Sequence, residues 1–128
     1  MKSRARTLIY STALPPPVVA AAIAALDLIE SDPGYAALPL AEAKAFTRRA
    51  GLPEATSPIV PVVVGEADAA LAASRMLEAE GFHAVPIRPP TVPKGTAHLR
   101  FSSTPGHPDA EIERVADLVR TRVLVVAA

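Results

Sequence analysis

The stretch from Ile87 to Phe101, IRPPTVPKGTAHLRF, decides how this chain is expected to fold. Short β-type runs, His83–Ile87 and Ala97–Ser102, stand on either side of its proline-rich centre. Because the connection between them is short, the two strands are expected to pair antiparallel. Within the second strand Arg100 alternates with the apolar Leu99 and Phe101, so its side chain is expected to point away from theirs.

Helices and one further strand are predicted around this hairpin. Three consecutive prolines set up a helix over Val18–Glu30, which is apolar on nearly every side and so typical of a buried helix. A turn is expected at Asp32–Gly34, and Pro39 is expected to break the next helix. The other predicted elements are a helix from Ala41 to Ala50, a strand over Ser57–Gly65, a helix over Glu66–Glu80 and a final helix opened by Pro108. This order predicts an α+β fold with a small, largely antiparallel sheet covered on one face by helices.

Composition limits the function classes. A chain of 128 residues, half of them apolar, is long enough for one domain over residues 1–128. Its thirteen basic and thirteen acidic side chains give a formal net charge of zero, whereas nucleic-acid-binding proteins usually carry a basic excess. There is no cysteine, so thiolate metal sites are excluded and no metal is expected.

The beginning of the sequence superficially resembles a secretion signal. Lys2, Arg4 and Arg6 precede an apolar stretch, but the three prolines from Pro15 interrupt it. The unbroken apolar run Val18–Leu26 is also far shorter than the roughly 20 residues needed to span a membrane. We therefore expect a soluble, cytoplasmic protein.

Two arginines, Arg88 and Arg100, stand on either side of the rigid bend. A guanidinium offers a planar fork of donors that suits one carboxylate or phosphate, and the bend could hold both on one side of a cleft. Alternatively, both are exposed arginines in weak ion pairs. The residue types alone favour this second interpretation and leave the first one open.

Three motifs carry a family resemblance over nearly the whole chain. IRPPTVPKGTAHLRF, followed by Gly106-His107 and a final helix, resembles the C-terminal segment of the α-oxoamine synthases, which are pyridoxal-phosphate enzymes of fold type I. LIYSTALPPPVVAAAIAALDLI and SPIVPVVVG are similar to the same family and occur in the same order. The resemblance implies the C-terminal small domain of such an enzyme, with residues 1–31 as the strand and helix at the interdomain and dimer interface.

The resemblance also implies a reaction. The Arg-Pro-Pro form of the bend is similar to the family member that condenses L-alanine with pimeloyl-CoA or pimeloyl carrier protein in biotin biosynthesis. Relatives that use glycine with other acyl-CoA substrates more often carry Tyr-Pro there. Arg100 matches the arginine that holds the carboxylate of the amino acid, while Arg88 and Thr91 match positions near the acyl thioester substrate at the mouth of the active site.

The cofactor residues implied by the resemblance are Tyr10, Ser11 and Thr12. They match a segment at the interface of a homodimer, where the Ser-Thr pair helps to bind the phosphate of pyridoxal phosphate in the neighbouring subunit. Hydroxyls and amides near a helix start suit a phosphate. From the residues alone, Thr12 instead stands at the start of a helix, where its hydroxyl accepts hydrogen bonds from free backbone amides and no phosphate is involved.

Other features of the family pattern are missing or altered. The enzymes need a lysine that binds the cofactor covalently, and Lys2, Lys44 and Lys94 do not stand in a family-like setting. We therefore expect a large pyridoxal-phosphate domain as partner, no cofactor bound covalently to this chain and no catalysis by the chain alone. His98 stands where a second basic residue, often arginine, is common. The alternatives are a stand-alone carboxylate-binding or dimerisation module without catalysis, a glycine-using synthase, or a purely structural remnant.

Overall fold

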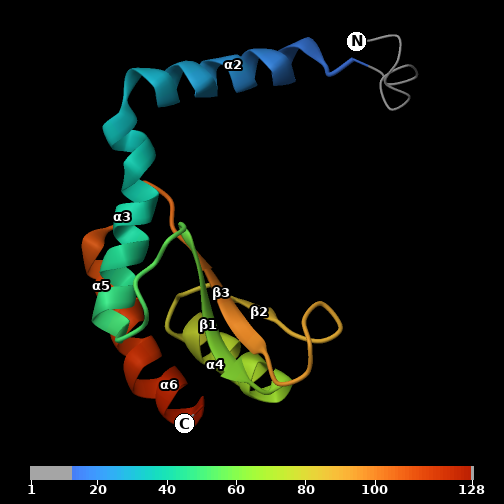
Figure 1. Ribbon diagram of the computed structural model, residues 1–128, viewed down its shortest axis with the longest axis vertical. Coiled ribbons are helices and arrows are strands. Elements are labelled where there is room, and N and C mark those ends of the chain that lie inside the picture. Colours follow the sequence, from blue (N-terminus) through green and yellow to red (C-terminus); the bar gives the residue numbers. More distant parts are fainter. Residues whose placement is uncertain (1–12, 128) are drawn as a thin grey trace. The chain divides into compact units, whose positions relative to one another are not determined.

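The computed structural model describes residues 13–127, which divide into two compact units between Ala36 and Ala37 (Figure 1). The first unit contains α2 (Pro16–Ser31) and the first residues of α3 (Pro33–Ala50). The second contains the rest of α3, a three-stranded sheet and the C-terminal helices. Within the described residues, no helix combines the length and the hydropathy that crossing a bilayer requires.

Helix α2 confirms the helix expected after the prolines. The carbonyl of Pro15 accepts hydrogen bonds from the amides of Val18 (3.0 Å) and Val19 (3.2 Å), which starts the first turn. None of its residues is buried, and Ile23 is 54% exposed. The expectation of a buried helix is not met, because the start of α3 is the only other element described in this unit. The helix therefore carries an uncovered apolar surface.

The break expected at Pro39 is wrong, because this residue lies inside α3. The expected turn at Asp32 is the entry to that helix: its Oδ1 accepts a hydrogen bond from the amide of Tyr35 (2.9 Å), and Pro33 is the first helical residue. A proline inside a helix removes one backbone donor, here the one that would bind the carbonyl of Tyr35. Tyr35 is 50% exposed, so water can satisfy its carbonyl and the helix continues.

The sheet contains β1 (Ile59–Gly65), β2 (Val85–Ile87) and β3 (Ala97–Ser102), in the order β1-β3-β2 with both pairs antiparallel. The predicted hairpin is confirmed by the pairing of β2 with β3. Strand β1 pairs along the other side of β3, which makes β3 the central strand. Pro61 lies in β1, an edge strand, where a missing ladder donor is tolerated.

Helices cover one face of this sheet. Helix α4 (Ala67–Ala79) packs against all three strands, while α5 (Asp109–Leu118) continues through a π-helical turn, η1 (Val119–Val123), into α6 (Leu124–Ala127) (Figure 1). The side chains of β1 alternate between exposed and buried, as a strand covered on one face requires. The largest fully buried side chains are Val62, Leu77, Leu99, Val119, Val123 and Thr47. The predicted α+β class with one covered face is confirmed.

Glycines end two of these helices. Gly81 has a φ of +88° after α4, and the amide of Phe82 returns to the carbonyl of Leu77 at 2.8 Å. Gly51 has a φ of +74° after α3, followed by the same kind of bond from Leu52. A left-handed residue at this position is cheap only for glycine, so the sequence fixes both helix ends.

Candidate functional site

Arg100 lies on the open face of the sheet, in the central strand β3. Its backbone partners are Pro61 of β1 on one side and Val85 of β2 on the other. The preceding Leu99 is fully buried against the helices, so alternation along the strand directs Arg100 to the uncovered face, where it is exposed. Pairing on both sides fixes the backbone that carries this guanidinium.

His98 shares the face of Arg100, two residues earlier in the same strand. It lies in register between Val63 and Ile87. Its Nδ1 lies 3.1 Å from the carbonyl oxygen of Thr96, and because a carbonyl oxygen can only accept, Nδ1 is the donor in this contact. Sequence reasoning noted His98 as a departure from the family pattern but did not place it beside Arg100, although their spacing of two along a strand could have done so.

Arg88 and Thr91 lie in the bend between β2 and β3. The amide of Thr91 donates to the carbonyl of Arg88 at 3.1 Å, and both residues are exposed. Arg88 follows Ile87, the partner of His98, so it lies beyond the end of the paired strands rather than beside Arg100. The placement of the two arginines on one side of a cleft stays a prediction.

Neither arginine is neutralised by a neighbour in the part of the chain that the structure describes. The ion pairs and side-chain hydrogen bonds made by arginines there involve Arg49, Arg114, Arg120 and Arg122. Beside Arg100 stand apolar residues on both neighbouring strands. A guanidinium in this setting can bind one carboxylate by donating two parallel charge-assisted hydrogen bonds to it.

The three predicted cofactor residues, Tyr10, Ser11 and Thr12, lie outside the described residues. Their role at a phosphate and at a subunit interface therefore stays a prediction. Among the described residues, no group of three or more His, Cys, Asp or Glu side chains could hold a metal ion.

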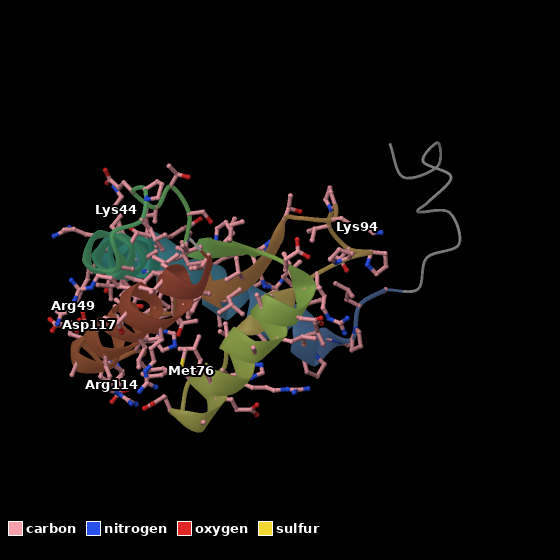
Figure 2. All side chains as sticks on the ribbon, turned by 90° about the horizontal axis from the view of Figure 1, so that it is seen from below. Lys44, Arg49, Met76, Lys94, Arg114 and Asp117 are labelled. Atoms are coloured by element: carbon pink, nitrogen blue, oxygen red, sulfur yellow. The ribbon has the colours of Figure 1, made fainter. Side chains whose placement is uncertain are left out.

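The two lysines in the described range lie in settings that do not favour a bond to a cofactor. Lys44 of α3 forms an ion pair with Glu54 at 2.9 Å, and its hydrogen bond lowers the pKa of that carboxyl. Lys94 is exposed on the bend between β2 and β3, well away from Lys44 (Figure 2). Lys44 is therefore held in an ion pair, and Lys94 is solvated at the surface.

Another charged cluster holds the helical layer together. Arg49 of α3 contacts Asp117 of α5 at 2.7 Å and Glu113 at 3.2 Å, and Figure 2 shows Arg49 and Asp117 side by side. The hydrogen bond from Arg49 lowers the pKa of Asp117, with a further contribution from Arg120. These pairs link helices on the covered side of the sheet and are structural.

Comparison with known proteins supports the family expected from the three motifs. The model of the family described as aminotransferase class I and II matches residues 1–119. The 8-amino-7-oxononanoate synthase of Methylocella silvestris is 60% identical over 120 residues, which cover 94% of this chain and 34% of the relative. That of Methylobacterium nodulans is 60% identical over 116 residues, 91% of this chain and 31% of the relative. The chain thus spans about a third of the length of these relatives.

Solved structures show the same fold. The 8-amino-7-oxononanoate synthase of Francisella tularensis matches with a TM-score of 0.74 and 25% identity, covering 96% of this chain and 37% of that one. Serine palmitoyltransferase of Sphingomonas wittichii matches with a TM-score of 0.82 over 98% of this chain and 33% of that one, and at 22% identity it supports the fold alone. From its sequence and its fold, the chain belongs to the aminotransferase class I and II family, and within it is similar to 8-amino-7-oxononanoate synthases.

Proposed function

We propose that this stretch supplies the substrate-carboxylate site of an 8-amino-7-oxononanoate synthase acting in the cytoplasm. The reaction condenses L-alanine with pimeloyl-CoA or pimeloyl carrier protein and releases carbon dioxide, the free thiol of the carrier and 8-amino-7-oxononanoate for biotin synthesis. One observation carries the proposal: Arg100 is fixed on the central strand of an open face, with no acidic partner among the described residues. The 60% identity to relatives of that name supports it.

Arg100 orients the amino acid in this proposal. Its two parallel donors hold the carboxylate of L-alanine and so fix the direction of the bond that joins this group to the α carbon. That bond later breaks when the carboxylate leaves as carbon dioxide. Arg88 and Thr91, exposed on the bend, contact the acyl thioester at the mouth of the site. Their backbone hydrogen bond keeps the bend in one shape.

The described residues do not fit covalent attachment of pyridoxal phosphate, because Lys44 is paired with Glu54 and Lys94 lies in a surface bend. Bound in such an enzyme, pyridoxal phosphate acts as an electron sink for a carbanion on the α carbon. We therefore assign its attachment to a large domain of the longer enzyme. Residues 1–128 form the small domain in this proposal, and on its own the stretch is inactive.

Residues 1–31 form the interdomain and subunit interface of a homodimer in this proposal. Tyr10, Ser11 and Thr12 contribute there to the phosphate site of the neighbouring subunit. The uncovered apolar surface of α2, which includes Ile23, supports a role for this segment in association.

A graft tests the proposal without requiring the rest of the protein. In the Methylocella silvestris synthase, the matched third is replaced by this stretch and the chimera is assayed with L-alanine and pimeloyl-CoA. Formation of 8-amino-7-oxononanoate is the expected result. A chimera that is folded and binds pyridoxal phosphate but makes no product contradicts the proposal. Product from glycine and a short acyl-CoA, with none from L-alanine and pimeloyl-CoA, favours the glycine-using synthases instead.

A second candidate, a stand-alone carboxylate-binding module, is favoured by the exposure of Arg100 in the chain by itself. Calorimetric titration of the 128-residue chain with L-alanine and with pimelate tests it. Saturable binding that is lost in Arg100→Ala, and kept in Arg75→Ala as a matched exposed arginine, supports that module. Absence of binding by the chain, together with an active chimera, leaves the enzyme as the function.

A further inference from the structure

All three phenylalanines of the sequence line one cavity on the covered side of the sheet. Phe46 comes from α3, Phe82 follows α4 and Phe101 belongs to β3, so three segments far apart in the sequence meet there. The cavity has a volume of about 490 Å³, within the range of roughly 300–1,000 Å³ that is usual for small-molecule sites. The sequence contains no tryptophan, so these rings are the largest apolar side chains available to it.

The rings form a rigid wall. The centroids of Phe46 and Phe101 are 4.9 Å apart, with their planes tilted by 33°. Phe82 is held by the guanidinium of Arg114, which lies 4.3 Å from the ring centroid. Ile112 of α5 also lines the cavity. An aromatic molecule placed among these rings gains offset or edge-to-face contacts with a surface that is already in place.

The rim of the cavity is polar, and the carboxylate among its lining residues is paired. His83, His107 and Ser103 line it together with Glu111. The Oε2 atom of Glu111 accepts a hydrogen bond from Nε of Arg114 at 3.1 Å and forms an ion pair with its Nη2 at 3.0 Å, so this carboxylate is already paired. Imidazole and hydroxyl groups therefore provide both donors and acceptors without favouring an ion.

One more carboxylate stands close to this rim. Oε2 of Glu42 lies 3.6 Å from Nδ1 of His107, and it is buried without a hydrogen-bond partner among the described residues. Glu42 does not itself line the cavity. His107 Nδ1 accepts a hydrogen bond from the amide of Thr104 at 3.3 Å, which helps to hold the imidazole in place.

We propose that the cavity binds a neutral aromatic molecule that carries a hydrogen-bonding group at its edge. The ring packs among the three phenylalanines, and the polar edge meets His107 and Ser103 at the rim. An anion would face the carboxylate of Glu111, whereas a cation would compete with Arg114 for the same carboxylate. The site is separate from the one proposed for the substrate carboxylate, because Phe101 and Arg100 alternate to opposite faces of β3.

Three indoles that differ in charge test the ligand class: tryptophol is neutral, tryptamine is a cation and indole-3-acetate is an anion. Because the chain has no tryptophan, indole fluorescence and its anisotropy report directly on the probe. We expect a saturable blue shift and rise in anisotropy for tryptophol at millimolar concentration or below. Binding of the two ions should be weaker by about threefold or more. A signal without saturation overturns the proposal, as does equal or tighter binding of an ion.

Two substitutions test whether tryptophol binds in this cavity. Ser103→Leu fills the cavity from its rim and should raise the Kd of tryptophol by about tenfold or more, whereas Thr56→Leu, at an exposed position outside the lining, should leave it unchanged. Ile112→Phe fills the cavity from α5 and gives the same test if the first variant does not fold. Unchanged binding in a folded, filled variant overturns the proposal. Arg100→Ala should bind tryptophol normally, and loss of binding there would refute the separation of the two sites.

Discussion

Replacing Arg100 in the chimeric synthase is the sharpest test of the proposed carboxylate site. The alanine variant removes two charge-assisted hydrogen bonds, each worth about 1.5–3 kcal/mol. Because Arg100 is exposed, we take the lower value, which gives about 3 kcal/mol or a loss of about a hundredfold in kcat/KM for L-alanine. The lysine variant keeps the charge but loses the planar fork, so its expected loss is about tenfold.

Steady-state assays with varied L-alanine and saturating pimeloyl-CoA measure this effect. The KM for pimeloyl-CoA should change little, since Arg100 contacts only the amino acid in this proposal. Arg75→Ala, at another exposed arginine on α4, is the matched control and should keep full activity. Substitution at an exposed position should alter the free energy of unfolding by no more than about 0.5 kcal/mol, so circular dichroism should show an intact fold. An alanine variant that keeps kcat/KM within about threefold of the unchanged chimera would refute the assignment.

Three further predictions concern stability and association. Leu99→Ala, at a fully buried position in the central strand, should lower the free energy of unfolding by about 2–5 kcal/mol in urea denaturation. Ile59→Ala, at a position that is 53% exposed, should lower it by less than about 1 kcal/mol. Equal losses would mean that the helices do not cover the face of the sheet that carries Leu99. Because Arg49 lowers the pKa of Asp117 in the folded chain, the contribution of this pair is present above the ordinary carboxyl pKa of about 4 and is lost as the pH falls through the folded value. The free energy of unfolding of Asp117→Asn should therefore fall less than that of the unchanged chain when the pH is lowered from about 6 to about 3. An identical fall in both chains would contradict a lowered pKa of Asp117. Ile23→Asp, on the uncovered surface of α2, should reduce self-association in sedimentation at high concentration, and an unchanged chain that is monomeric there would argue against association through this helix.

The elements that follow local rules could be predicted from the sequence. The hairpin of β2 and β3 follows from two β-type runs joined by a short, proline-rich bend. Gly81 ends α4 because only glycine adopts its backbone conformation cheaply. The prediction at Pro39 was wrong because the hydrogen bond lost there belongs to Tyr35, a residue that is 50% exposed, so the helix tolerates the loss.

Arg100 could be singled out from its alternation in a strand and from the family motif, but its neighbour on strand β1 could not be predicted. Pro61 lies beside it only because β1 pairs with β3 across a long stretch of intervening sequence. His98 was recognised only as a departure from the family pattern, although its spacing of two from Arg100 in one strand already predicts the same face. The strand register agrees with that placement. That Arg88 and Arg100 share one side of a cleft was one of two interpretations of the residues, and it stays a prediction.

By itself, the sequence determined the α+β class, the antiparallel hairpin, the glycine-marked ends of α3 and α4 and the family, because each depends on residues close together or on a motif of fixed order. Only the tertiary structure decided that β3 is the central strand and that Phe46, Phe82 and Phe101 surround one cavity. Such contacts join positions far apart in the chain. They are selected by the burial of whole faces against one another, and no local propensity or periodicity records which faces will meet.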